Sequence, residues 1–153
     1  MIKKEQLILA TSLELKSLAD ERISEAEILS ANAKHEGVFY LAGYAIEFAL
    51  KVVICERLDA EIFDKSLDGS QRYISQKALN AFMTHNLKDL LTLSGLRRQL
   101  EKDKKNNDDL VAAWSEVANW SEERRYDFGC TERAACDFLN DSKILLAWIR
   151  QYW

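Results

Sequence analysis

The chain has 153 residues with a net charge of −4, 48% hydrophobic and 30% charged residues, which allows one domain and excludes a disordered or collagen-like chain. It has no Pro and 5 Gly, and because tight turns recruit both residues, this composition predicts a mostly helical protein. Because its net charge is negative, the chain lacks the excess of basic residues that is typical of sequence-independent nucleic-acid binding.

The N-terminal segment is predicted to be helical to about residue 34. Leu7, Ile8 and Leu15 lie at helical spacing in residues 3–15. Ser17-Leu18-Ala19-Asp20 has the form of a capping box, which would begin a helix there. The pattern leaves open whether this segment is one long helix or two short ones. Gly37 is predicted to break the helical pattern.

Residues 38–58 are predicted to form the central helix of the fold. This segment is apolar around most of its circumference, so it must be buried by several neighbours, or by neighbours and a partner subunit. Its narrow polar face carries Tyr40, Tyr44, Glu47 and Lys51.

Glu47 and Lys51 form an i,i+4 pair on this otherwise apolar helix. The pair is either a surface ion pair or part of a site or interface. If Glu47 is partly buried, its carboxylate needs a cation from elsewhere in the fold. Gly43 beside the pair would let another backbone approach closely.

The second half of the chain predicts shorter elements. Residues 59–83 are less regular, with a turn at residues 68–70. His85-Asn86 can cap a short helix over residues 87–94, which Gly95 ends. Residues 97–105 are charged and are predicted to be solvated.

Two further helices are predicted near the C-terminus. One begins at residues 106–108 and runs to about residue 120, and the other follows a Thr131 cap and runs to about residue 152. We therefore predict an all-α fold, an antiparallel up-and-down bundle of four to five main helices, as a single domain over residues 1–153.

Cysteine usage and hydropathy predict a cytoplasmic protein. Cys55, Cys130 and Cys136 are odd in number and lack C-x-x-C spacing, which favours a reducing compartment. The N-terminal residues do not have the pattern of a secretory leader. No apolar run approaches the roughly 20 residues of a membrane span, so no membrane partner is expected.

The polar residues that carry chemistry fall in three clusters: the Glu47–Lys51 pair, His85, and a group within residues 120–126. His35 and His85 lack zinc-ligand spacing and no Gly-rich phosphate loop is present, so no metal and no cofactor are expected. His85 either caps a helix or takes part in a site. A third cluster suits base stacking and phosphate binding, unless its aromatic residues belong to the core and its arginines pair with nearby glutamates; its members are Trp120, Arg124, Arg125 and Tyr126.

These three segments, residues 40–51, 85–96 and 120–126, together resemble the HEPN family. The resemblance rests on YLAGYAIEFALK, HNLKDLLTLSGL and WSEERRY, in this order and spacing. It implies a four- or five-helix bundle that forms homodimers through its long helices. It also implies a link to RNA or nucleotides, often in toxin–antitoxin, antiviral or stress systems, with a nucleotidyltransferase or an antitoxin as protein partner.

The chain departs from the family at the ribonuclease motif, R-x(4–6)-H. The nearest preceding arginines, Arg72 for His85 and Arg22 for His35, are each separated from the histidine by twelve residues. Enzymatic activity is therefore not carried over from the resemblance. If RNA is cut, the catalytic candidates are His85 as general base and Arg125 as the group that stabilises the phosphorane.

Three hypotheses follow. The favoured one is a non-catalytic homodimeric module that binds a nucleotide, RNA or a protein. The second is a metal-independent endoribonuclease with a rearranged site, and the third is a structural or regulatory subunit without a ligand. The predicted ligand-binding residues are Tyr44, Glu47, Lys51, His85, Trp120, Arg124, Arg125 and Tyr126.

Overall fold

The computed structural model describes residues 10–123 and 129–153, and within these ranges the protein is a helical bundle without a β-strand. The three longest helices are α1 (Ser12–Ala31), α2 (His35–Leu58) and α8 (Glu132–Ile149). The shorter ones are α3 (Gly69–Arg72), α4 (Gln76–Leu79), α5 (Leu87–Leu93), α6 (Arg97–Lys104) and α7 (Asp108–Val117). Two 3₁₀ turns cover Asn80–Phe82 and Arg150–Tyr152. The predicted all-α class is confirmed.

The N-terminal segment forms one continuous helix from Ser12, so the expected start at Ser17 is wrong. Thr11 is the N-cap, because its hydroxyl accepts a hydrogen bond from the amide of Glu14 at 3.1 Å. Ser17 lies inside α1 and its hydroxyl contacts the Leu13 carbonyl at 3.5 Å. Residues 3–9 of the expected first helix lie outside the described residues.

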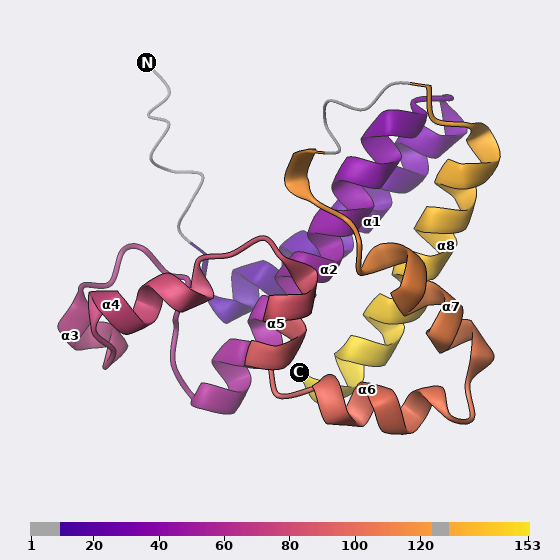
Figure 1. Ribbon diagram of the computed structural model, residues 1–153. Coiled ribbons are helices and arrows are strands. Elements are labelled where there is room, and N and C mark those ends of the chain that lie inside the picture. The colour runs from indigo at the N-terminus through magenta and orange to yellow at the C-terminus, as the bar shows by residue number, and fades with distance from the viewer. Residues whose placement is uncertain (1–9, 124–128) are drawn as a thin grey trace, which may run out of the picture.

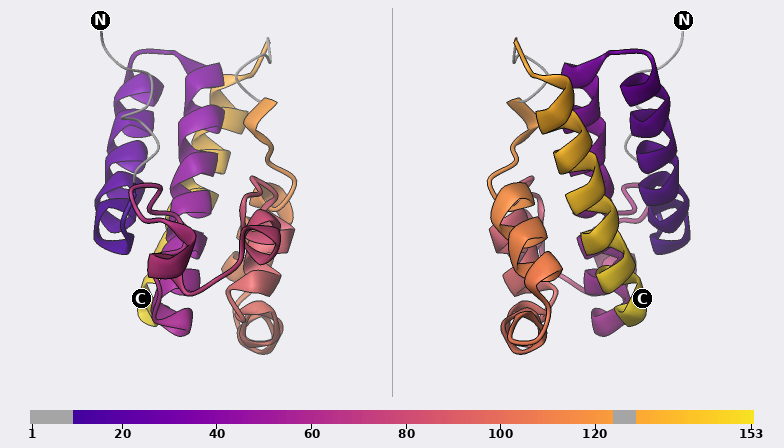
Figure 2. Two further views of the ribbon diagram at one scale, coloured as in Figure 1. Left: turned by 90° about the vertical axis from the view of Figure 1, so that its left-hand side faces the viewer. Right: turned by 90° about the vertical axis from the view of Figure 1, so that its right-hand side faces the viewer.

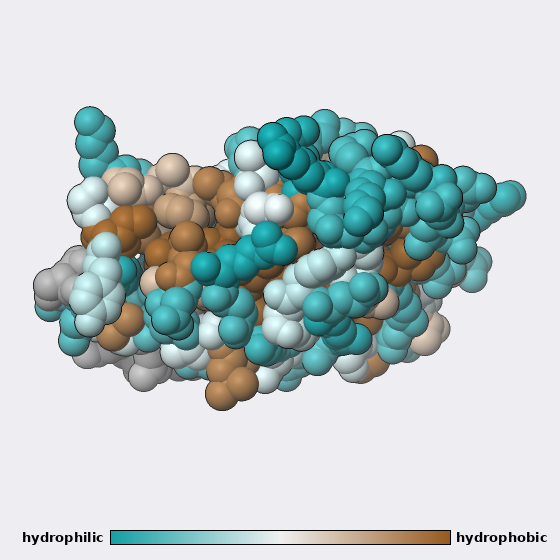
Figure 3. Space-filling view, turned by 90° about the horizontal axis from the view of Figure 1, so that it is seen from below, coloured by the Kyte–Doolittle hydropathy of each residue, from teal (hydrophilic) through white to brown (hydrophobic). Residues whose placement is uncertain are grey.

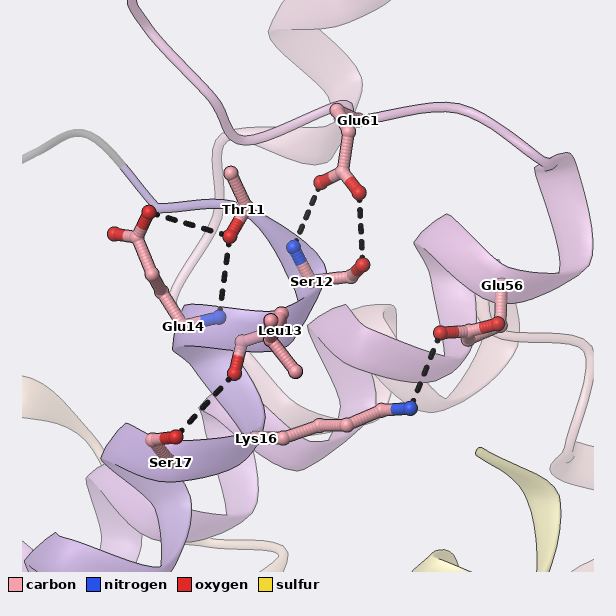
Figure 4. A network of polar contacts seen from close by, with 8 residues as sticks. All are labelled: Thr11, Ser12, Leu13, Glu14, Lys16, Ser17, Glu56 and Glu61. Carbon is pink, nitrogen blue, oxygen red and sulfur yellow. Dashed lines mark hydrogen bonds and ion pairs between the residues drawn. The ribbon is translucent and has the colours of Figure 1, made fainter.

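The start of α1 is fastened to the segment that follows α2 (Figure 4). The Glu61 carboxylate accepts from the Ser12 amide at 2.7 Å and from the Ser12 hydroxyl at 2.8 Å. Lys16 pairs with Glu56 at 3.3 Å near the end of α2. These contacts fix the N-terminal end of α1 beside the C-terminal end of α2, as an antiparallel pair requires.

The chain reverses at Asn32–Lys34, before the predicted break at Gly37. Ala33 takes a left-handed conformation with φ 57°, and the Lys34 amide donates to the Leu29 carbonyl at 2.9 Å. Gly37 lies within α2, where its missing Cβ leaves room for the end of the Leu29 side chain. The expected break is therefore misplaced by a few residues.

Helix α2 is the central helix, as predicted, and it is covered by helices of its own chain. In Figures 1 and 2 α1, α2 and α8 run side by side, and α1 and α8 make the most extensive contacts with α2. Thirteen residues of α2 are buried, from Val38 to Cys55. Several neighbours within the described chain thus account for its apolar circumference, which was one of the two alternatives.

Helix α2 also corrects the expectation that no segment suits a membrane span. It is the one helix of the described residues that is long and apolar enough by length and composition. However, 72% of its most apolar window is buried inside the protein. A buried core helix meets the same criterion, so this feature is weak support for a membrane-spanning role.

Helix α6 (Arg97–Lys104) occupies the segment 97–105, for which only a charged, solvated surface was predicted. Leu100 is completely buried and anchors α6, whereas the lysine-rich end remains mostly outside. Seen from below, the side of the molecule that contains α6 is largely hydrophilic, while apolar side chains are visible on the opposite side (Figure 3). The segment is therefore solvated, as expected, but helical.

Helices α5, α7 and α8 begin or end near the predicted caps. Asn107 caps α7 and Thr131 caps α8, each accepting a hydrogen bond from the amide three residues later. At residues 68–70, where a turn was expected, α3 begins at Gly69. Gly95 ends α5 with φ 76°, the left-handed conformation predicted for it.

Helix α5 is capped by Asn86, which directly follows His85. The Asn86 side chain accepts from the Asp89 amide at 3.0 Å. We expect Asn86→Ala to lower the free energy of unfolding by about 1 kcal/mol, because the cap is lost. Urea denaturation measures this, with Asn106→Ala as the control, since no side-chain hydrogen bond is found for the exposed Asn106 within the described ranges. An equal loss in both variants would contradict the cap.

Candidate functional site

Glu47 occupies the centre of the candidate site and is one of the completely buried residues of α2. One of its carboxylate oxygens, Oε2, has no hydrogen-bond partner in the described part of the chain. Burying a carboxylate without a partner is costly, so the groups that contact Glu47 are central to the site. The sequence left open a surface ion pair, and the burial excludes it.

His85 is the group from elsewhere in the fold that meets the buried Glu47, and it is a cation when its ring is protonated. Its Nδ1 atom forms a short contact with Glu47 Oε1, and the other ring nitrogen, Nε2, lies 3.3 Å from Glu122 Oε2. The hydrogen bond from Glu47 raises the pKa of His85 above its usual 6.5, and burial opposes this shift. His85 thus bridges α2 and the segment after α7.

Lys51 is the second cation beside Glu47, one turn further along α2. Its Nζ atom lies 3.8 Å from Glu47 Oε2 and 5.0 Å from the centre of the Phe63 ring. Only 12% of its side chain is exposed. Burial lowers the pKa of Lys51, the Glu47 carboxylate opposes this, and repulsion from Lys65 adds to the lowering.

Tyr44 completes the polar face of α2 in the site. Its ring contacts those of His85 and Trp120 edge to face, with centroids 6.1 and 5.0 Å apart. Burial raises the pKa of Tyr44, and hydrogen bonding to Tyr40 acts in the same direction. The phenol therefore stays protonated at neutral pH and can donate or accept a hydrogen bond.

Trp120 is a core residue. The sequence had left open whether its indole packs in the core or stacks on a base. Its indole is 3% exposed and lies directly over Gly43, where an added Cβ would be 2.0 Å from Nε1. A side chain, and not the expected backbone, approaches Gly43. Because the ring is enclosed by α2, it does not offer a free face to a base.

Three residues predicted for the site, Arg124, Arg125 and Tyr126, lie outside the described residues. The neighbouring Glu122 lies within them and reaches His85. The structure thus brings together Tyr44, Glu47, Lys51 and His85, with Glu122 added. The described residues contain no group of three His, Cys, Asp or Glu side chains that could hold a metal ion.

Tyr44, Glu47, Lys51 and His85 line a cavity of about 500 Å³. The cavity lies between α1, α2 and the two connections that flank α3 and α4. Leu15 and Leu18 of α1 and Phe48 of α2 form apolar walls. Phe63, Lys65 and Met83 contribute from the connections. A concave, mostly apolar space with a few converging polar groups is the usual form of a ligand site.

The cavity contains residues that sequence reasoning missed. Phe63, Lys65 and Met83 come from the irregular stretch between α2 and α5, where no periodic pattern indicates which side chains face inward. Leu15 and Leu18 were identified as helix residues but not as site residues. The spacing of Glu47, Phe48 and Lys51 on one helix was the available signal for the α2 wall.

The arrangement supports three kinds of chemistry. Lys51 and Lys65 can hold an anionic group, and Glu47 Oε2, which has no hydrogen-bond partner in the described residues, can accept a hydrogen bond from a ligand N–H or O–H group. His85, oriented by a carboxylate on one nitrogen, has the arrangement of a general acid or base. The apolar walls lower the local dielectric and thereby strengthen these interactions.

His85 predicts a pH dependence of stability. Because its pKa is raised in the folded state, its pairing with Glu47 is fully stabilising below the unfolded value, near 6.5, and this contribution is lost as the pH rises through the folded pKa. We expect the stability difference between the wild type and His85→Gln to shrink as the pH rises above 6.5. Urea denaturation across pH measures it, and a difference that grows with pH would contradict the pairing.

We find no protein family, curated protein or solved structure that matches this chain.

Proposed function

We propose that the protein is a non-catalytic, HEPN-like binding module of the cytoplasm that holds a nucleotide, or one unit of an RNA, in the cavity above Glu47. The observation that supports this most directly is the combination in one 500 Å³ cavity of apolar walls, two lysines and a buried carboxylate with a free oxygen. Phosphate oxygens suit Lys51 and Lys65, and a base N–H group suits Glu47 Oε2. Phe48, Phe63 and Met83 supply apolar contacts for a base.

Titration calorimetry with ATP, GTP and short RNA oligonucleotides tests this function. We expect binding of at least one of these ligands with a Kd below about 1 mM, as for a weak but specific site. Lys51→Met should weaken binding about tenfold or more, because it removes the enclosed cation from the cavity. Lys88→Met is the matched control, since Lys88 lies on the surface of α5 and pairs with Asn119.

Flat titrations with every nucleotide and RNA would contradict this proposal. They would leave the third hypothesis, a structural or regulatory subunit in which the polar groups only stabilise the bundle. A Kd that changes equally in Lys51→Met and Lys88→Met would place binding outside the cavity.

The second candidate is a metal-independent endoribonuclease, which the orientation of His85 supports. With Nδ1 held by Glu47, Nε2 would exchange a proton with a ribose hydroxyl that replaces its 3.3 Å contact with Glu122. We expect such an enzyme to cut labelled RNA in EDTA and to lose this activity in His85→Ala and Arg125→Ala. Cleavage that survives His85→Ala would exclude this mechanism.

We also propose that the protein forms a homodimer. Helices of the same chain already cover most of α2, so this proposal rests on the HEPN resemblance alone. Light scattering at micromolar concentration tests the oligomeric state. Twice the monomer mass supports the proposed dimer, and a strict monomer contradicts it and removes one of the supports for the HEPN assignment.

A further inference from the structure

Lys51 has an environment that is unusual for a lysine. Its side chain is 12% exposed, and its nearest acid oxygen, Glu47 Oε2, lies at 3.8 Å, beyond hydrogen-bond distance. The described residues provide no hydrogen-bond acceptor for the amine. Lys51 nevertheless lines a cavity that is large enough for a small molecule.

We propose that Lys51 is a nucleophilic amine that condenses with the carbonyl group of an aldehyde or ketone in this cavity and forms a Schiff base. The proposal rests on the enclosed amine, the adjacent carboxylate and the apolar walls, and it does not depend on whether the cavity also takes a nucleotide. Lysines that form Schiff bases are activated in the same way, by desolvation or by a neighbouring cation.

Burial shifts the Lys51 amine towards its neutral, nucleophilic form, whereas the charges around it act in both directions. Burial lowers the pKa of Lys51, and repulsion from Lys65 lowers it further. Glu47 acts in the opposite direction, but part of its charge is already engaged by His85. The Phe63 ring under the amine also favours the cation, so the net lowering reflects the burial.

The condensation balances with the groups that are present. The lone pair of Nζ adds to the carbonyl carbon, the C=O π pair moves to oxygen, and the oxygen takes up one proton. The C–O bond then breaks as C=N forms, and both N–H protons of the amine leave in the released water. Glu47 Oε2, beside Nζ and coupled through its other oxygen to His85, can accept and return these protons.

Reductive trapping tests the proposal on the intact protein. The folded protein is incubated at pH 7 with limiting benzaldehyde and sodium cyanoborohydride, which reduces each imine to a stable benzylamine. Mass spectrometry after digestion then gives the rate at every lysine. We expect Lys51 to react about ten times faster or more than the exposed Lys77, Lys88 and Lys105, because each unit of lowered pKa gives about tenfold more neutral amine.

Two variants separate reactivity from simple access. Lys51→Arg keeps the charge and should lose the fast labelling without new labelling elsewhere. Lys65→Met removes the repulsion and should slow the labelling of Lys51 a few-fold at pH 7, with a smaller effect at pH 10, where exposed lysines also become neutral. Circular dichroism confirms that each variant is folded.

The proposal is overturned if folded protein is labelled at Lys51 no faster than at the three exposed lysines. An unchanged or faster Lys51 rate in Lys65→Met would also contradict it. Failure of the nucleotide titrations leaves the trapping result unaffected, so the two proposals are tested separately.

Discussion

Replacing Gly43 by Ala should lower the free energy of unfolding by about 3 kcal/mol, which is a severe effect of overpacking. An added Cβ would lie 2.0 Å from Nε1, 2.1 Å from Cε2 and 2.3 Å from Cδ1 of Trp120. The indole is 3% exposed and has no space to retreat, and α2 is held between α1 and α8. Urea denaturation measures the loss.

Gly37→Ala is the matched control on the same helix. Its added Cβ would meet only the end of the flexible Leu29 side chain, at 2.7 Å. A small strain there is offset by the helix propensity of alanine, about 1 kcal/mol better than glycine. We therefore expect almost unchanged stability in Gly37→Ala. In a Trp120→Leu background Gly43→Ala should cost much less, and equal costs in both backgrounds would contradict the clash.

Replacing Glu47 by Ala should destabilise the protein by about 3–5 kcal/mol, because removal of one partner leaves the enclosed Lys51 without a compensating charge. Glu47 is completely buried, and its carboxylate is the one acid within 4 Å of Lys51 Nζ in the described residues. The same change removes the contact between His85 and the α2 carboxylate. Chemical denaturation at pH 7 measures the loss.

Two further variants show whether this loss arises from the charges. Glu122→Ala, on the exposed side of His85, should cost at most about 1 kcal/mol, as for a surface pair. Glu47→Ala with Lys51→Met should be more stable than Glu47→Ala alone, because the unpaired cation is gone. If the double variant is less stable than the single one, the interpretation of Lys51 as an uncompensated cation is wrong.

The fold was largely predictable because its signals are local. The absence of Pro, the apolar residues 38–58 and the caps Asn86 and Thr131 gave the class, the central helix and two helix starts. The errors also have local causes. Ser17 resembles a cap, but Thr11 takes that role, and the reversal needs a left-handed Ala33, a conformation that propensity does not favour for alanine.

The site was predictable only where it follows one helix. The polar face of α2 and a requirement for a distant cation pointed to Glu47 and Lys51. His85 was named as a candidate. It lies 38 residues from Glu47 in the chain, so their contact depends on tertiary packing. Phe63, Lys65 and Met83 come from a segment without periodicity, so no pattern indicated that they face the cavity.

The central claim is that Glu47 and His85, from separate segments of the chain, are directly paired in the lining of the cavity. A double-mutant cycle with Glu47→Gln, His85→Gln and the double variant measures the coupling directly. At pH 6 we expect a favourable coupling free energy of about 1 kcal/mol or more, falling as the pH rises. A coupling of zero within error at pH 6 would contradict the account.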